Sequence, residues 1–535
     1  MATQEKLAKV IVDAFRQRGV RRLFGVPGGG SSLDLIDAAA KSDMDFILCR
    51  TETSAAIMAS VAGELSGKPG GALAGIGPGA ASMVNGVAYA FLECAPLIAI
   101  TDSRDQQPNT IHQGIDQGAI FAPLTKASER LSENSSGGRI NEMFDIALSH
   151  PRGPVHFDMT SKAASAMVDV SRNSESIDGR GSRAGALIEV ASALEGAQRP
   201  VIIVGLEART DECARGIINI SEKLNAPVLV TYKAKGVVPD EHPLFTGVFT
   251  GARTEARTLG QADVILFYGV DAVEIIPGNW GYSGDLVTIN EGPYRAMPCE
   301  PRYIAWGDLD CLTQRLNGAL EKTASKWSYK EVAKLRSDMR TESSMKDAKM
   351  INTANVVETV QDIATENYRI SVDSGAHMFS AMGLWKAKRP HDVLKSNGLS
   401  TMGFAVPAAI ASSLEEPNRP IIAFTGDAGL MMCLSELSTA VRLGCNITVI
   451  VLNDAALSLI DIKQQRQQRQ SVGVRYPNTN FSRTAEGMGC RSWRVDSING
   501  LVHAFKASIN VEGPSLIDVT VDPTGYADQL GVLRG

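Results

Sequence analysis

The sequence predicts an α/β fold of three doubly wound parallel-sheet domains. A chain of 535 residues has the length of about three ordinary domains. Apolar runs typical of buried strands alternate with runs of helical periodicity, as they do where helices join parallel strands. Polar stretches at 165–184 and 322–349 interrupt this alternation and are expected to be linkers. The predicted domains therefore cover residues 1–170, 185–325 and 350–535.

The composition restricts the class of protein. Hydrophobic residues make up 44% of the chain and charged residues 21%, which is typical of a globular enzyme. A net charge of −6 gives no attraction to nucleic acid or to an anionic membrane. No apolar run is long enough to span a bilayer, and residues 1–19 are typical of an amphipathic helix rather than a signal peptide. The expected location is the cytoplasm, where the eight cysteines, none in a CxxC pair, stay free thiols.

The first domain is expected to open with a glycine-rich turn. A strand at 20–24 leads into Gly25-Val26-Pro27-Gly28-Gly29-Gly30, and Ser31 is the expected N-cap of a helix at 33–40. Glycines allow the backbone to turn tightly and to approach a ligand closely. A tight turn without any chemical role would carry the same residues.

A glutamate at the start of the next helix is the first candidate functional residue. The strand at 46–49 runs into Glu52, and a helix of small residues follows. Such a glutamate is usually a solvated acid that the helix dipole favours. A further turn at 77–79 leads into another helix and strand, and its pattern resembles that of a segment near the C-terminus. An internal duplication of one α/β block is therefore plausible.

The middle domain is expected to contain a second parallel sheet. It contains no recognisable metal-binding or nucleophile constellation, which favours a mainly structural role. The expected strands are 201–205, 227–232, 263–269 and 286–290.

The last domain carries two carboxylates at the ends of two apolar strands. A strand at 421–424 ends in Gly426-Asp427-Ala428-Gly429, a helix with Leu430, Leu434, Leu437 and Val441 on one face follows, and a strand at 448–452 ends before Asp454. Open α/β sheets bind ligands at this edge. A glycine turn, a helix N-terminus and oxygen ligands suit a diphosphate held by Mg²⁺ or Ca²⁺. An ordinary strand-turn-helix with a capping aspartate is the alternative.

The segment GDAGLMMCLSELSTAVRL, followed by VIVLND, resembles the thiamine diphosphate motif of the acetolactate synthase and pyruvate decarboxylase family. The pattern is most similar to the acetolactate synthase large, catalytic subunit. The resemblance implies Mg²⁺ bound by the side chains of Asp427 and Asp454 and by the carbonyl of Ala456. Ala428 and Asp454 stand where the family usually has Gly and Asn, although a catabolic branch also has Asp there. The implied cofactor contacts in this region also include Gly426, Ala428, Gly429 and Leu457.

Two further segments resemble cofactor-binding parts of the same family. RTETSAAIMASVAGELSGKPG resembles the segment around the activating acid, so Glu52 is expected to hydrogen-bond N1′ of the cofactor pyrimidine. SNGLSTMGFAVPAAIAS resembles the loop beneath the thiazolium. Met402 is then the apolar wedge that bends the cofactor, and the carbonyl of Ser400, where the family usually has Gly, accepts from its amino group. The first domain is thus the implied pyrimidine-binding domain and the last the diphosphate-binding domain.

The resemblance also bears on the reaction. Pyruvate decarboxylases have an Asp at the position of Gly29, a His-His pair where this chain has the single His112, and a Glu at the position of Ile460. Release of an aldehyde therefore lacks its usual proton donors. Leu459 and Ile460 leave an apolar pocket that favours attack on a second carbonyl. We expect carboligation of the acetolactate type, with pyruvate as the 2-oxo acid.

Other positions refine this expectation. Gln113 and Lys126 fall where acetolactate synthases carry a Gln and a Lys near the substrate, so Gln113 and Gly29 are assigned to the catalytic pocket with Glu52. Lys463 stands where anabolic enzymes select the larger acceptor with a Trp, and the presence of Glu52 argues against a glyoxylate carboligase. A non-ligating 2-oxo acid decarboxylase or another C–C lyase, including one that acts on acyl-CoA, is the alternative. A non-catalytic cofactor-binding protein is a third possibility.

The resemblance carries expectations about cofactors and partners. Thiamine diphosphate and Mg²⁺ are the expected cofactors. FAD is not expected, because FTGVFTGARTEA lacks the Gly-Met-His-Gly of flavin-binding relatives. A homodimer or homotetramer is expected, with active sites at the subunit interface, since the family joins the first domain of one subunit to the last domain of another.

Overall fold

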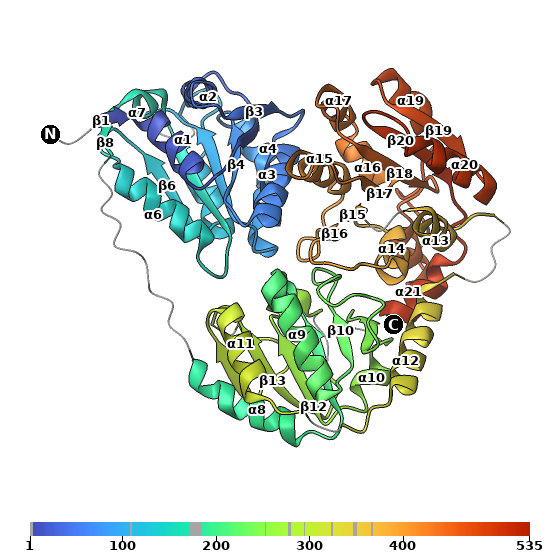
Figure 1. Ribbon diagram of the computed structural model, residues 1–535. Coiled ribbons are helices and arrows are strands. Elements are labelled where there is room, and N and C mark those ends of the chain that lie inside the picture. Colours follow the sequence, from blue (N-terminus) through green and yellow to red (C-terminus); the bar gives the residue numbers. More distant parts are fainter. Residues whose placement is uncertain are drawn as a thin grey trace. The chain divides into compact units, whose positions relative to one another are not determined.

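The structure is a computed structural model that contains three six-stranded sheets (Figure 1). Every pairing within these three sheets is parallel, as the sequence predicts. The residues that it describes are 4–106, 110–170, 183–251, 253–276, 280–293, 295–322, 325–345, 350–364 and 367–534. Among them, no helix combines the length and apolar character that crossing a membrane requires.

The chain divides into two compact units. One comprises Met1–Gly179, Val406–Asn418 and Cys433–Cys445. The other comprises Arg180–Ala405, Arg419–Met432 and Asn446–Gly535.

The first sheet has the strand order β3-β2-β4-β5-β7-β6. A short antiparallel pair of β1 (Gln4–Lys6) and β8 (Met167–Asp169) lies outside it. The strands are β2 (Arg22–Val26), β3 (Asp45–Leu48), β4 (Gly70–Ala74), β5 (Leu97–Asp102), β6 (Ala127–Leu131) and β7 (Pro154–Met159). The helices are α1 (Leu7–Gln17), α2 (Ser31–Ala40), α3 (Glu52–Ser66), α4 (Pro78–Leu92), α5 (Gln117–Phe121), α6 (Gly137–Leu148) and α7 (Ser161–Ser165).

The second sheet has the order β11-β10-β9-β12-β13-β14, which is that of a dinucleotide-binding fold. The strands are β9 (Pro200–Val204), β10 (Val228–Val230), β11 (Phe245–Val248), β12 (Val264–Tyr268), β13 (Asp285–Asn290) and β14 (Tyr303–Trp306). The helices are α8 (Leu187–Gly196), α9 (Asp211–Leu224), α10 (Ala256–Leu259) and α11 (Leu309–Ala319).

The third sheet has the order β16-β15-β17-β18-β20-β19. Its strands are β15 (Arg369–Val372), β16 (Val393–Lys395), β17 (Ile421–Gly426), β18 (Ile447–Asn453), β19 (Arg491–Val495) and β20 (Ser515–Thr520). The helices of this part of the chain are α12 (Tyr329–Ser343), α13 (Thr353–Ile363), α14 (His377–Leu384), α15 (Ala405–Glu415), α16 (Asp427–Cys433), α17 (Glu436–Arg442), α18 (Ser458–Arg466), α19 (Phe481–Gly487), α20 (Ile498–Ser508) and α21 (Tyr526–Arg534).

The first and third sheets share one topology. In each, the strands that come second, first, third, fourth, sixth and fifth along the chain follow one another across the sheet. This agreement supports the internal duplication that the sequence suggests. It places the β4–α4 connection and the junction between β17 and α16 at equivalent positions of the two sheets.

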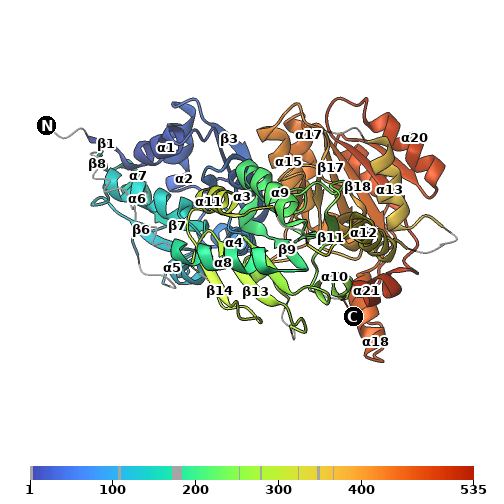
Figure 2. The same ribbon diagram turned by 60° about the horizontal axis from the view of Figure 1, so that its bottom comes forward.

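Burial explains why the central strands are continuous apolar runs. Every residue of β4, β5, β9, β12 and β18 is buried. A strand is buried along its whole length only when both faces of its sheet are covered, here by the helices between the strands (Figures 1 and 2).

Several expectations about local structure are wrong. Ser31 does not cap α2: Gly30 is the N-cap residue, and Ser31 is buried within the helix. The single helix expected after β17 is two short helices, α16 and α17, separated at Leu434-Ser435. The helix α12 lies within the polar stretch 322–349, because Val332 and Met339 give it one buried face beneath its charges.

The expected linker 165–184 and the expected strands of the middle domain also need correction. Residues 167–169 form β8, while 171–182 lie outside the described residues. The strands β11 and β14 are missing from the expectation. Both are edge strands of four residues, too short for a clear apolar run.

The glycine-rich turn before α2 is held by one buried carboxylate. Asp102, at the end of β5, accepts hydrogen bonds from the backbone N–H of Gly30 (3.2 Å) and Ser32 (2.6 Å). It also accepts from the hydroxyls of Ser31 (2.8 Å) and Ser32 (2.6 Å). A Cβ at Gly28 would come within 2.1 Å of the same carboxylate, so only glycine fits there.

Replacing this carboxylate should destabilise the first unit. Asp102→Ala leaves buried donors without an acceptor, and we expect the free energy of unfolding to fall by about 3 kcal/mol. Asp37→Ala on α2, which removes an exposed pair with Lys41, should cost less than about 0.5 kcal/mol. Thermal or denaturant unfolding monitored by circular dichroism measures both, and equal stability of the two variants would contradict the assignment.

Candidate functional site

Two carboxylates meet at one edge of the third sheet. The strands β17 and β18 are adjacent and parallel, with Gly426 paired to Leu452. Asp427 and Asp454 follow these strands directly, Asp427 as the first residue of α16. Parallel neighbours end on the same edge, which explains why residues 27 positions apart in the sequence lie together.

Asp427 is fixed by three hydrogen bonds and is only 3% exposed. One oxygen accepts from the N–H of Ala428 (2.7 Å) and the hydroxyl of Tyr476 (2.9 Å), and the other from the N–H of Ala455 (2.7 Å). Ala455 has φ 57°, a left-handed conformation that alanine rarely adopts. The loop after β18 is thus tied to Asp427, and such strain is typical of functional sites.

Asp454 is half-buried beside Asp427. It accepts hydrogen bonds from the hydroxyl of Ser458 (2.5 Å) and the N–H of Ala456 (3.3 Å). Burial raises the pKa of Asp454 to about 6, and the charge of Asp427 contributes to this shift. Burial also raises the pKa of Asp427. A divalent cation between the two carboxylates would offset the cost of keeping both ionised, so this pair fits a metal ion.

The remaining metal ligands would have to be oxygens of other kinds. Among the described residues, no group of three or more His, Cys, Asp or Glu side chains could hold a metal. Mg²⁺ usually takes one or two carboxylates and completes its octahedron with phosphate oxygens and water. The two carboxylates, the carbonyl of Ala456 and a diphosphate match that requirement.

A cavity of about 580 Å³ surrounds this pair. All the cofactor-contact residues predicted in the last domain line it: Ser400, Met402, Gly426, Asp427, Ala428, Gly429, Asp454, Ala456 and Leu457. The structure therefore brings together residues from three separate segments of the sequence. Their contacts with a cofactor stay predictions.

The loop before α15 shapes one wall of this cavity. Ser400 has φ 51°, a left-handed conformation that favours glycine and accounts for the glycine usual at this position. Its hydroxyl donates to the carbonyl of Asn397 (2.9 Å). Met402 is half-buried and lines the cavity. Its side chain can therefore pack against the protein and also contact a bound ligand.

The sequence did not single out His377, which also lines the cavity. It is the first residue of α14, and its buried Nε2 has no hydrogen-bond partner among the described residues. Burial lowers its pKa to about 3, so the ring is neutral. A neutral imidazole with an unpaired nitrogen suits a phosphate oxygen if that nitrogen carries the proton. Its position after β15, the neighbour of β17, was the signal that could have identified it.

The residues predicted in the first domain lie at turns of the first unit. Glu52 is the first residue of α3, after the N-cap Thr51, and is partly exposed. Its carboxylate lies 3.1 Å from where a Cβ of Gly79 would be, so glycine in the α4 turn leaves room for it. Gly29 is exposed, with nothing within 4 Å of its Cβ position. Gln113 is exposed and has φ 63°.

Two other residues of this unit have different surroundings. The ammonium group of Lys126 donates to the carbonyls of Ile146 and Ser149 (2.5 Å each) and to the hydroxyl of Ser149 (2.7 Å). Burial lowers its pKa to about 8. Lys126 thus satisfies carbonyls at the C-terminal end of α6. His112 is exposed.

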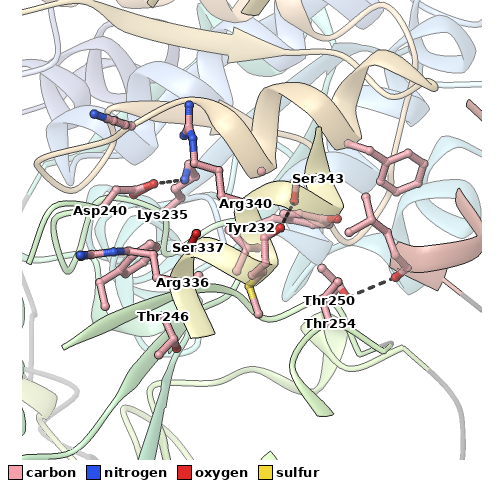
Figure 3. Close-up of a pocket in the computed structure, with 18 of the residues that line it drawn as sticks. Tyr232, Lys235, Asp240, Thr246, Thr250, Thr254, Arg336, Ser337, Arg340 and Ser343 are labelled. Atoms are coloured by element: carbon pink, nitrogen blue, oxygen red, sulfur yellow. Dashed lines mark hydrogen bonds and ion pairs between the residues drawn. The ribbon is translucent and has the colours of Figure 1, made fainter. Parts of the chain in front are cut away.

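A second cavity, of about 520 Å³, lies between β11, α12 and α14 (Figure 3). Its cationic side chains already bind groups of the chain. Lys235 pairs with Asp240, Lys386 with Glu241 (3.1 Å) and Arg340 with Glu358 (3.1 Å). Arg336 donates to the carbonyl of His242 (2.9 Å). These contacts support a structural role for the charges of this cavity.

Three models of one protein family match the chain. The thiamine pyrophosphate enzyme N-terminal TPP binding domain matches residues 5–120, the central domain 187–293, and the C-terminal TPP binding domain 373–519. The chain belongs to the thiamine pyrophosphate enzyme family. Its three parallel sheets correspond to the three matched domains of this family.

Curated relatives in this thiamine pyrophosphate enzyme family span nearly the whole chain. The acetolactate synthase of Bacillus subtilis (strain 168) is 27% identical over 98% of this chain and 94% of its own length. The catabolic acetolactate synthase of Raoultella terrigena is 29% identical over 96% of this chain and 95% of its own length. The acetolactate synthase isozyme 1 large subunit of Escherichia coli (strain K12) is 27% identical over 96% of this chain and 94% of its own length.

Cofactor binding should depend on both carboxylates. Asp427→Ala and Asp454→Ala each remove a predicted charged oxygen ligand. The affinity for thiamine diphosphate at fixed Mg²⁺ should therefore fall by about 100-fold or more, since the loss of a residue that only hydrogen-bonds a metal ligand typically costs about 10- to 100-fold. Asp454→Asn should stay within about tenfold of the parent, because the amide oxygen still coordinates. Titration calorimetry measures these affinities.

The exposed Asp496 of the same domain serves as the control. Asp496→Ala should leave the affinity unchanged. If both Asp427→Ala and Asp454→Ala bind the cofactor like the parent, the metal assignment is wrong.

Proposed function

We propose that the protein is a thiamine diphosphate- and Mg²⁺-dependent enzyme that decarboxylates a 2-oxo acid, pyruvate, and joins the remaining fragment to a second carbonyl compound, as an acetolactate synthase does. The observation that carries this proposal is the wall of the cavity around Asp427. Apart from the metal-binding pair, no carboxyl side chain lines it among the described residues, and Leu459 and Ile460 make part of it apolar. A carboxylic acid that would protonate the intermediate and release an aldehyde is therefore missing from this wall.

The chain's own residues divide the work. Asp427, Asp454 and the carbonyl of Ala456 would hold Mg²⁺ and the diphosphate. Met402 would support the thiazolium, and Glu52 would bind the pyrimidine ring. When bound, thiamine diphosphate supplies a nucleophilic carbon and an electron sink for the 2-oxo group.

Two cations at the cavity favour an anionic substrate. Lys463 and Arg466 of α18 both line it, and a positive charge near the opening attracts a carboxylate from solution. A 2-oxo acid donor carries that carboxylate, as does an acceptor of the same kind. An acyl-CoA substrate, which is also anionic, is the main alternative among C–C lyases.

The names of the relatives support this reaction. Three of them are acetolactate synthases from different organisms, and one of these three is named as a catabolic enzyme. We further propose a cytoplasmic homodimer or homotetramer in which Glu52 of one subunit serves the cofactor bound by the last domain of another.

We infer that the central domain holds no FAD. At the switch point between β9 and β12, Glu274 accepts hydrogen bonds from the N–H of Leu206 (2.7 Å) and Asp271 (3.1 Å). Glu207 accepts from the N–H of Glu291 (2.8 Å), and burial raises its pKa to about 7. Carboxyl groups thus occupy backbone donors where a dinucleotide-binding fold would hold a diphosphate.

The product distribution tests the proposed reaction. With pyruvate, the enzyme should form acetolactate in excess of acetaldehyde. Ile460→Glu introduces an acid into the cavity, so the ratio should shift toward acetaldehyde by about tenfold or more. Ile460 is 46% exposed, so a new carboxylate there stays hydrated and the fold is preserved.

Ile460→Gln, which has similar size but no acidic proton, should retain the parent ratio. Chromatography of the products from a panel of 2-oxo acids, each with and without an added aldehyde, measures these outcomes. Acetaldehyde alone, or turnover only of a CoA thioester, would overturn the acetolactate assignment. No turnover of any substrate by cofactor-loaded protein would favour a non-catalytic role.

Glu52 should control activation of the cofactor but not its binding. Glu52→Gln keeps the size of the side chain and leaves the metal site untouched, so thiamine diphosphate affinity should stay within about threefold while kcat falls by about tenfold or more. Deuterium exchange at the cofactor's C2, followed by NMR, should slow in parallel. An unchanged exchange rate would refute the proposed role of Glu52.

A further inference from the structure

Glu436 is a fully buried carboxylate on the first turn of α17, with 0% exposure. One oxygen accepts hydrogen bonds from the backbone N–H of Arg50 (2.9 Å) and Thr51 (3.1 Å). The other accepts from the hydroxyl of Thr439 (2.7 Å). All four residues belong to the same compact unit. Burial of a carboxylate is costly without such donors, so this contact is a specific feature of the fold.

The segment that Glu436 binds is the connection that ends at Glu52. Arg50 and Thr51 lie between β3 and α3, and Glu52 is the next residue. Their N–H groups precede the helix and have no partner within it, and Glu436 satisfies both. Thr51 in turn caps α3 by accepting from the N–H of Ser54 (3.1 Å).

Two more contacts from α17 hold the same connection. Ser438 accepts from Nε of Arg50 (2.9 Å), and Arg442 donates to the carbonyl of Leu48. Three residues of one short helix therefore bind the backbone or side chain of residues 48–51. The direction of the Glu52 side chain depends on the backbone just before it, which α17 fixes from one side.

We infer that Glu436 is a positioning residue for Glu52. This inference rests on the proposed function of Glu52 as the group that binds the cofactor pyrimidine. Glu436 is fully buried, so in this role it acts through Glu52 and not on the cofactor itself. Its two backbone hydrogen bonds set the start of α3, and so the angle at which Glu52 leaves the helix. Small displacements of a catalytic group cost rate rather than affinity, because they alter the geometry of proton transfer.

Glu436 lies close in the sequence to the predicted metal ligand Asp427. The helix α17 begins shortly after α16 ends, with only Leu434 and Ser435 between them, and α16 starts with Asp427. The same strand-turn-helix segment therefore carries the predicted metal ligand Asp427 and the residue that fixes Glu52.

Glu436→Ala should reduce activity through Glu52. We expect kcat to fall by about tenfold to 100-fold, with the KM for the 2-oxo acid and the affinity for thiamine diphosphate within about threefold of the parent. Deuterium exchange at C2 of the bound cofactor should slow by the same factor as kcat. Glu436→Gln, whose amide oxygen can still accept from the two N–H groups, should recover most of the rate.

The double variant separates positioning from a merely structural role. If Glu436 acts through Glu52, Glu436→Ala should have almost no further effect on C2 exchange in a Glu52→Gln background, because the group it positions is already inactive. Multiplicative effects in the double variant would overturn the inference. Where Glu436→Ala folds poorly, Glu436→Asp, whose shorter side chain withdraws the carboxylate from the N–H groups of Arg50 and Thr51, is compared in both backgrounds. It should slow C2 exchange in the parent but hardly further in Glu52→Gln, and an equal slowing in each would likewise overturn the inference.

Glu415→Gln is the matched control. Glu415 lies in the same compact unit and binds Arg22 of β2 (3.2 Å), away from residues 48–51. Its replacement should leave kcat and C2 exchange unchanged. The failures of the two proposals are distinguishable: normal exchange in Glu52→Gln refutes the role of Glu52. Slow exchange in Glu52→Gln together with normal exchange in Glu436→Ala refutes only the positioning by Glu436.

Discussion

The parallel pairing of β17 with β18 is the constraint on which the candidate site depends. It brings Asp427 and Asp454 to one edge of a sheet, where burial raises the pKa of both carboxyl groups. Two carboxylates in this arrangement repel each other and lose hydration. A cation between them would offset this repulsion, and the proposed metal ion would in turn attract a diphosphate. The geometry of the strands therefore favours a cationic ligand at this edge.

The rest of the cavity follows from the same edge. The hydrogen bond from the N–H of Ala455 to Asp427 ties the loop after β18 to the helix after β17, and holds Ala455 in a strained conformation. Ser400, on a different loop, is also left-handed. Both positions cost conformational energy that the surrounding packing must offset. Glycine at either position would adopt the same backbone conformation without this cost. The presence of Ala455 and Ser400 therefore supports a binding role for these loops.

The fold was largely predictable, because apolar runs and helical periodicity report burial directly. The three parallel sheets, and most strands that the sequence predicts, are present. The failures have physical causes. The edge strands β11 and β14 are too short to show a pattern, and α12 hides one apolar face under many charges. Ser31 has the residue type of an N-cap, but its hydroxyl donates a hydrogen bond to Asp102 instead of capping the helix. Tertiary contacts of this kind are invisible in local sequence.

The candidate site likewise contains residues that the sequence could identify and residues that it could not. Residues of the Gly426–Gly429 turn and Asp454 could be assigned because their types, spacing and strand ends define a chemistry. His377 could not, because a lone histidine after a strand is usually structural, and only its buried, unpartnered Nε2 beside the cavity distinguishes it among the residues that the structure describes. Glu436 was equally hidden. It is one acid among 59 in the chain, and only its contacts with Arg50 and Thr51 reveal its place.

The duplication of one α/β block offers a reason for this arrangement. The first and third sheets have the same strand order, so the turn after β4 and the turn after β17 are equivalent. Yet the residues after the equivalent strands differ: Asp427 follows β17, while Gly79, in the first turn of the helix α4 that follows β4, leaves room for Glu52. Under the proposed function, one copy would hold a metal and a diphosphate, and the other a carboxyl group beside an aromatic ring. One scaffold can therefore carry both halves of the proposed cofactor site, because the side chains at the ends of its strands differ between the two copies.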